Sequence, residues 1–164
     1  MEDLRFELLS DTVYSLIPLL KKHFRPNFDI LDEYGTLTKA YLPLLFALLA
    51  ADKLIMSEAA KQVGLSKPHI TLQVSRLVEE GLLERRPESE DRRLISISLT
   101  PKGSDLVHRL KGSIKEKAGR LFSGLPEETL ERTVGALLTL KEVMAGADRQ
   151  DRNRRKRAGS ETPL

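Results

Sequence analysis

The chain has 164 residues, no cysteine, a formal net charge of +3 and hydrophobic residues at 40% of its positions. These values predict one domain with a buried core, and the lack of cysteine excludes disulfide bonds and a cysteine-based redox switch. Residues 41–51, the longest apolar stretch, fall short of the roughly 18 residues that a membrane-spanning helix needs, so we expect a cytoplasmic protein without membrane contact.

Two helices are predicted in the first third of the chain. The first is long, and its apolar positions recur at helical spacing. They are Leu4, Leu8, Val13, Leu16, Ile17, Leu20 and Phe24. Pro18 should kink or divide this helix, because proline lacks an amide hydrogen. A polar connection over residues 25–35 then precedes a helix over residues 38–51, with Thr38 as its N-cap and Pro43 in its interior.

Residues 57–81 have the pattern of a helix-turn-helix. Ser57 should cap the first helix and Gly64 should end it, while Ser66 caps a second helix that Gly81 closes. The second helix has an apolar face with 3.6-residue spacing, formed by Ile70, Val74, Leu77 and Val78. Two helices joined by a short, glycine-containing turn form the unit that places its second helix in the DNA major groove.

The other faces of this second helix are polar and cationic. Such side chains reach base edges and phosphates, so this helix is the candidate recognition helix. Its candidate DNA contacts are Ser66, Lys67, Pro68, His69, Thr71, Gln73, Ser75 and Arg76. Two alternatives are that the unit is only a compact way to pack helices, or that it faces another protein in an assembly without specific DNA binding.

A short β-hairpin follows, with strands predicted over residues 82–86 and 94–99. In the second strand, apolar and polar residues alternate with the period of a half-buried strand. Arginines at the tip of such a hairpin suit a narrow minor groove. The candidate contacts are Arg86, Asp91, Arg92 and Arg93. The alternative is a solvated turn, because four acidic residues between positions 84 and 91 balance the four arginines.

Beyond the hairpin, Thr100 should cap a helix with Pro101 at its first position. Residues 123–128 break the pattern, and a last amphipathic helix follows. We expect residues 1–36 and 104–147 to form dimerisation helices around a core of residues 37–103, all within one domain of residues 1–147. Residues 148–164 carry the whole net charge of +3 and lack apolar periodicity, so they are predicted to be a basic, disordered tail.

Residues 91–103, Asp-Arg-Arg-Leu-Ile-Ser-Ile-Ser-Leu-Thr-Pro-Lys-Gly, closely resemble the wing signature of the MarR family (multiple antibiotic resistance regulators). That signature is an Asp-x-Arg, a strand, and a Leu-Thr-x-x-Gly that opens the next helix. Gly64-Leu65-Ser66 and residues 81–85 are also similar to that family. The resemblance covers roughly residues 37–145, nearly all of the predicted folded part.

The resemblance implies a mainly α (α+β) winged helix-turn-helix with flanking dimerisation helices. It also implies a homodimer that binds an inverted-repeat operator in double-stranded DNA, commonly as a repressor, and that a small ligand often releases. Asp91 would orient the wing, and Arg93, together with Arg92, would enter the minor groove. Leu72 and Gln73 depart from the family pattern, in which an arginine followed by a leucine is common at these positions.

The sequence offers little for chemistry. His23, His69 and His108 are isolated, and no group of side chains has the spacing of metal ligands, so no metal, cofactor or enzymatic activity is expected. Family members often bind aromatic or phenolic ligands between the dimerisation helices and the winged helix. The resemblance therefore implies a small aromatic effector with candidate pocket walls at Tyr14, Phe24, Tyr41 and Phe46. The alternative is that these four are ordinary core residues.

Overall fold

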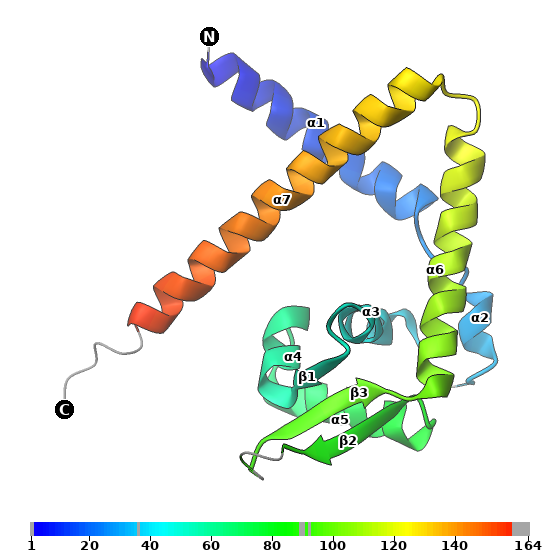
Figure 1. Cartoon of the computed structure of the whole chain (residues 1–164), viewed down its shortest axis with the longest axis vertical. Coiled ribbons are helices and arrows are strands. Elements are labelled where there is room, and N and C mark those ends of the chain that lie inside the picture. The colour runs from blue at the N-terminus through cyan, green and yellow to red at the C-terminus, as the bar shows by residue number, and fades with distance from the viewer. Residues whose placement is uncertain (1, 36, 89–90, 92, 159–164) are drawn as a thin grey trace. The chain divides into compact units, whose positions relative to one another are not determined.

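The computed structural model describes residues 2–35, 37–88, 91 and 93–158, without the side chains of residues 2, 148–149 and 151–158 (Figure 1). The candidate contact Arg92 therefore lies outside the described residues, as do residues 159–164 of the tail. The chain forms two compact units, Met1–Ala118 and Gly119–Leu164. The described part is mainly helical with one small antiparallel sheet, as the sequence predicts.

The elements follow one another along the chain in the order that the hydrophobic pattern predicts, with three short additions. They are α1 (Glu2–His23), α2 (Asp29–Asp32), a 3-10 helix η1 (Lys39–Tyr41), α3 (Leu42–Ala51), β1 (Lys53–Ile55), α4 (Met56–Val63), α5 (Lys67–Glu79), β2 (Leu83–Pro87), β3 (Ile95–Leu99), α6 (Pro101–Phe122) and α7 (Glu127–Ala158). The sequence did not indicate α2 or β1, and η1 lies within the helix predicted over residues 38–51. Each of these has three or four residues, which is too few for a periodic pattern.

The sheet consists of β1, β3 and β2 in that spatial order, and both pairings are antiparallel. In the hairpin, Leu83 pairs with Leu99 and Pro87 with Ile95. β1 pairs with the other edge of β3 and thereby ties the segment between α3 and α4 to the hairpin. Figure 1 shows the strands of the hairpin running away from the start of α6.

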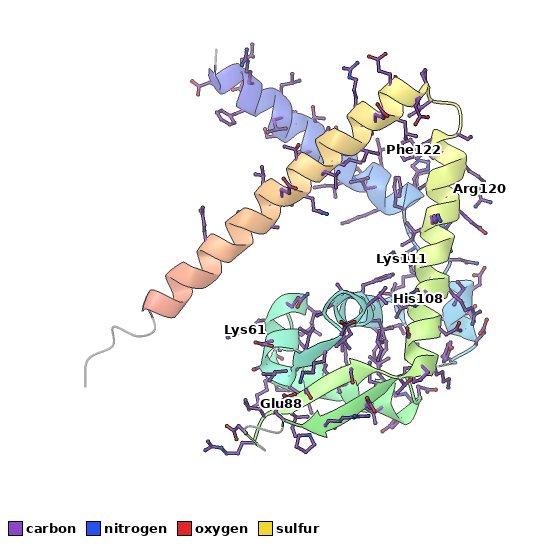
Figure 2. The ribbon with its side chains drawn as sticks, viewed as in Figure 1. Lys61, Glu88, His108, Lys111, Arg120 and Phe122 are labelled. Carbon is purple, nitrogen blue, oxygen red and sulfur yellow. The ribbon has the colours of Figure 1, made fainter. Side chains whose placement is uncertain are left out.

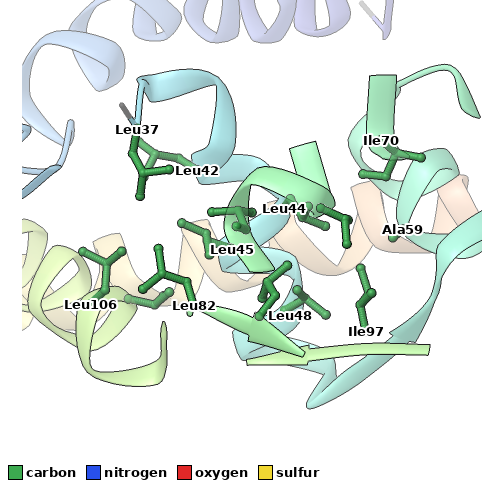
Figure 3. Packing of buried hydrophobic residues seen from close by; sticks show 14 of the residues in the cluster. Leu37, Leu42, Leu44, Leu45, Leu48, Ala59, Ile70, Leu82, Ile97 and Leu106 are labelled. Carbon is green, nitrogen blue, oxygen red and sulfur yellow. The ribbon is translucent and has the colours of Figure 1, made fainter. Parts of the chain in front are cut away.

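The core of the first unit is built mainly from leucines. α3 contributes Leu44, Leu45 and Leu48, each with no exposed surface (Figure 3). They join the predicted apolar face of α5, where Ile70, Val74 and Leu77 are buried, and the start of the predicted face of α6 at Leu106, Val107 and Leu110. Burying one such side chain contributes roughly 1.5–3 kcal/mol. Turning α5 about its axis would expose several of them, so these contacts define the orientation of α5.

The junction between the hairpin and α6 is closely packed. Thr100 caps α6 as predicted, because its Oγ1 accepts a hydrogen bond from the amide of Gly103 at 3.1 Å. The same hydroxyl donates to the carbonyl oxygen of Gly81 at 2.6 Å. A Cβ at position 103 would lie 2.0 Å from the carbonyl oxygen of Leu82, so no side chain fits there. These contacts therefore hold the start of α6 against the residues that follow α5.

The connection between α1 and α3 lies along α6. The carboxylate of Glu33 accepts hydrogen bonds from both terminal nitrogens of Arg109, which lowers the pKa of Glu33. The amide of Asn27 donates to Ser113 Oγ at 2.8 Å, and Lys117 Nζ donates to the carbonyl oxygen of Arg25 at 3.0 Å. The predicted connection over residues 25–35 is thus a fixed segment that contains α2.

Several predicted boundaries need correction. α4 begins at Met56, so Ser57 lies inside it and is not its N-cap. Thr38 precedes η1, and Pro43 lies in the first turn of α3, where its missing amide hydrogen breaks no helical bond. α1 is one helix that contains Pro18.

The predicted disorder from residue 148 is not observed over residues 148–158, which continue α7. No glycine or proline occurs between residues 147 and 158. Alanine, arginine, lysine and glutamine, which make up most of this segment, are good helix formers. The helix therefore continues beyond the end of its apolar stripe.

The apolar faces of α1 and α7 are largely exposed. In α1, Leu4 and Leu8 keep 69% and 68% of their surface. In α7, the exposed apolar side chains include Val134, Leu137 and Leu138. Among the described helices, none is both long enough and apolar enough to cross a bilayer.

Candidate nucleic-acid interface

The exposed face of α5 follows from the burial of its opposite side. With Ile70, Val74 and Leu77 in the core, a 3.6-residue helix must direct the intervening positions outward. Lys67, Pro68, His69, Thr71 and Leu72 are all exposed. Most of the predicted recognition-helix contacts therefore share one accessible surface with a basic residue at its start.

Ser66 is the N-cap residue of α5, as predicted, with extended backbone angles. Its hydroxyl makes no hydrogen bond to a helix amide and lies 2.8 Å from His69 Nδ1 instead. Both side chains are exposed, so the pair forms a polar group at the first turn of α5 that carries donor and acceptor capacity.

The hydroxyls of Thr71 and Ser75 are directed back toward their own helix. Thr71 Oγ1 donates to the carbonyl oxygen of Lys67 at 2.8 Å, and Ser75 Oγ donates to the carbonyl oxygen of Thr71 at 2.9 Å. Such bonds to a carbonyl one turn earlier are common for these residues within helices. Both hydroxyls are predicted DNA contacts whose protons are already engaged within α5.

Arg85 of β2 connects the wing to α5, and sequence reasoning missed it. Its Nη2 donates to Ser75 Oγ at 2.8 Å and to the carbonyl oxygen of Thr71 at 3.3 Å. The sequence did contain a signal, because Arg85 follows the buried Leu83 by two positions and so shares its face of the strand. The sequence-based candidate was instead the neighbouring Arg86.

Two other predicted contacts of α5 are turned away from the exposed face or are paired. Gln73 is half-buried, and its Nε2 donates to the carbonyl oxygen of Ala40 in η1 at 3.2 Å. Its Oε1 is buried and has no hydrogen-bond partner among the described residues. Arg76 pairs with Glu79 at 2.9 Å and Glu80 at 3.2 Å. The hydrogen bond to Glu79 is the largest cause of the raised pKa of Arg76.

In the wing, Asp91 and Arg93 form a local clamp. Asp91 Oδ1 accepts hydrogen bonds from the backbone amide of Arg93 at 3.0 Å and from its Nε at 3.1 Å. The Arg93 guanidinium beside it lowers the pKa of Asp91. The side chain of Arg93 is nevertheless 91% exposed. Arg93 is therefore accessible, and its entry into a minor groove stays a prediction.

Acidic side chains also brace the hairpin. Arg86 pairs with Glu84 at 2.9 Å, and Glu84 also accepts a hydrogen bond from Ser98 at 3.1 Å. Glu88 pairs with Lys53 of β1 at 3.0 Å, and the pKa of Glu88 is lowered by hydrogen bonds from Ser96 and Lys53. Figure 2 shows Glu88 near the tip of the hairpin. These acids therefore pair with basic side chains within the sheet, and the solvated-turn alternative stays open.

The four aromatic residues expected around an effector line neither of two hollows found among the described residues. Tyr14 is 80% exposed on α1, whereas Tyr41 and Phe46 pack against the leucine core. One hollow is lined by Phe28, Leu31, Asp32, Leu37, Thr38, Lys39 and Ala40, and the other by Met56, Thr71, Arg85, Arg86, Pro87 and Ile95. Within the described ranges, no group of three or more metal-ligating side chains could hold an ion.

A helix-turn-helix with an exposed polar surface on its second helix, followed by a hairpin with exposed arginines, has the architecture of a winged helix, which is common among DNA-binding proteins. Residues 36–94 match the sequence profile of the MarR family. The chain is 29% identical over 153 residues to the HTH-type transcriptional repressor MdtR of Bacillus subtilis, covering 93% of this chain and 97% of MdtR.

Two solved structures agree with the fold. A MarR family protein from Bacillus stearothermophilus matches with a TM-score of 0.74 at 19% identity, over 88% of this chain and 99% of that one. NadR in complex with 4-hydroxyphenylacetate matches with a TM-score of 0.63 at 22% identity, over 85% of this chain and 91% of that one. The chain is thus similar to winged helix-turn-helix transcriptional regulators of the MarR family, in part of its sequence and in its fold.

Proposed function

We propose that the protein is a homodimeric repressor that binds an inverted-repeat operator in double-stranded DNA and releases it when a small effector binds. The observation that carries the proposal is the exposed Arg93, clamped by Asp91, on the same unit as the exposed face of α5. A winged helix that places α5 in the major groove reaches the adjacent minor groove with its hairpin, where arginine is favoured. The similarity to the repressor MdtR supports the direction of regulation.

The exposed apolar faces of α1 and α7 support the homodimer. Leucines that keep about half or more of their surface in water lose a contribution of roughly 1.5–3 kcal/mol each that burial would supply. A second copy of the chain would cover them, and a two-fold dimer matches a two-fold operator. Half-sites about one helical turn apart would follow from that symmetry.

Release by a small aromatic effector is part of the proposal. NadR was solved with 4-hydroxyphenylacetate, a phenolic acid. Tyr14, Phe24, Tyr41 and Phe46 line neither of those two hollows, so their role as pocket walls rests on the resemblance alone. A ligand can release the operator only if it binds the DNA-free conformation more tightly than the DNA-bound one. Phenolic acids are therefore the first compounds to test for displacement of a labelled operator.

The experiment that tests DNA binding is fluorescence anisotropy with the DNA upstream of the protein's own gene, against a scrambled duplex, at several salt concentrations. We expect saturable binding that prefers the upstream DNA and that weakens as salt rises, because phosphate contacts release counterions. Equal, salt-sensitive binding to both duplexes would contradict sequence-specific recognition of that DNA.

The alternative is a winged helix that serves protein–protein assembly without specific DNA binding. Arg76 favours it in part, because Glu79 and Glu80 already neutralise its charge. A protein with this role would bind neither duplex even at low salt. The salt series of the same experiment therefore separates the two functions.

A further inference from the structure

Leu72 is an apolar side chain at the centre of the exposed face of α5. It keeps 69% of its surface exposed. Pro68 and His69 lie one turn before it, and Ser75 and Arg76 lie one turn after it, at the spacings that bring side chains together on a helix. Single exposed leucines are common on protein surfaces. The position of this one, midway along the candidate recognition helix, is what calls for an explanation.

The polar side chains around Leu72 already have partners inside the protein. Thr71 and Ser75 hydrogen-bond to carbonyls of α5, and Arg85 donates to both Ser75 Oγ and the carbonyl of Thr71. Gln73 is turned toward η1, and Arg76 pairs with Glu79 and Glu80. In the middle of α5, Leu72 is therefore the long side chain that would enter a groove without breaking an existing bond.

Leucine has no hydrogen-bond donor or acceptor, so it cannot read the polar pattern of a base edge. The apolar group that the major groove offers is the C5 methyl of thymine, which distinguishes T·A from the other pairs. We propose that Leu72 contacts the thymine methyl of a T·A pair near the centre of each half-site and thereby helps to determine sequence specificity. This inference rests on the proposed function.

The test uses the full-length protein and its operator, with one thymine of each half-site at a time replaced by deoxyuridine. This change keeps Watson–Crick pairing and removes only the methyl group. At one position the wild-type protein should lose about fourfold in affinity per half-site, the change expected for one buried methyl group. Leu72→Ala should bind the normal operator more weakly and lose its sensitivity to deoxyuridine at that position. His69→Ala is the matched control on the same face, and it should keep that sensitivity.

Three outcomes would overturn the proposal. Wild-type affinity could be the same for every deoxyuridine operator, or the loss at one position could persist in Leu72→Ala. Leu72→Ala could also keep full affinity for the normal operator, which would show that the side chain makes no contact with DNA. Alanine is a better helix former than leucine, so this variant should keep its helix, and thermal melting checks it. Absence of wild-type binding to any duplex would instead refute the proposed function itself.

Discussion

Arg93 and Arg85 both belong to the wing, but their hydrogen bonds give them different roles. Arg93 bonds to Asp91, two residues away, and keeps 91% of its side chain exposed. Arg85 reaches across to α5 and bonds to Ser75 Oγ and the carbonyl of Thr71. The first arrangement leaves the guanidinium of Arg93 exposed, whereas the second joins the wing to α5.

Replacing Arg93 by alanine should weaken operator binding by about 1–3 kcal/mol if this arginine reads the minor groove. The thermal stability should hardly change, because the side chain is exposed and its partner Asp91 is partly exposed as well. Anisotropy titration and a melting curve measure the two quantities. An unchanged affinity with an intact fold would remove the wing from the proposed interface.

Arg85→Ala should lower operator affinity by a different route, because the wing loses its link to α5. The double-mutant cycle with Ser75→Ala tests this, since removing either partner should have much the same effect. We expect a coupling of about 0.5–3 kcal/mol in the free energy of DNA binding. Arg85→Lys keeps the charge but lacks the planar fork, so it should recover only part of the affinity. Additive losses would show that Arg85 acts on DNA independently of Ser75.

At the scale of the elements, local patterns predicted well and long-range contacts did not. The apolar face of α5 and the cap at Thr100 follow from neighbouring residues, and both are confirmed. β1 was missed because its three residues acquire their structure only by pairing with β3. The partners of Gln73 and Arg85 lie 33 and 10 or more positions away. No periodicity reports such contacts, so the sequence predicted which face of α5 is exposed but not which side chains on that face already have partners.

The packing of α6 against the end of α5 makes Gly103 sensitive to substitution. A Cβ there would lie 2.0 Å from the carbonyl oxygen of Leu82, which is backbone and cannot move aside alone. Gly103→Ala should destabilise the protein by about 1–3 kcal/mol, as overpacking does. Gly112 lies in the same helix, and a methyl group added there would meet nothing within 4 Å, so Gly112→Ala should stabilise by about 0.5–1 kcal/mol.

Chemical denaturation of both glycine variants measures these changes. The dependence of the free energy of unfolding on denaturant concentration should be the same in both, as expected for an unaltered two-state transition. If Gly103→Ala were as stable as Gly112→Ala, α6 would have to shift away from Leu82 at little cost. The close contact between Gly103 and Leu82 would then not fix the position of the wing relative to α6.

At the scale of the whole molecule, the basic C-terminal segment is separable from the rest. Residues 148–164 hold six basic and three acidic residues and account for the whole net charge of +3. Their deletion should leave the oligomeric state unchanged and at most reduce the salt dependence of DNA binding, because each lost phosphate contact lowers the slope by about one. Light scattering and a salt titration measure both properties. If the truncated protein were monomeric, residues 148–164 would have to contribute to the dimer interface.

The exposed apolar stripe of α7 leads to the strongest expectation at this scale. Leu137 keeps 51% of its surface exposed, and burying it against a second chain would make a charge there costly. Leu137→Glu should therefore convert the dimer to a monomer and weaken operator binding by more than tenfold, since two half-sites would no longer be bound together. Thr139→Glu adds the same charge about 160° around the helix from Leu137 and should leave the dimer intact. Analytical ultracentrifugation at several concentrations distinguishes the two. Equal dissociation of both variants, or of neither, would mean that α7 is covered by something other than a second copy of this chain.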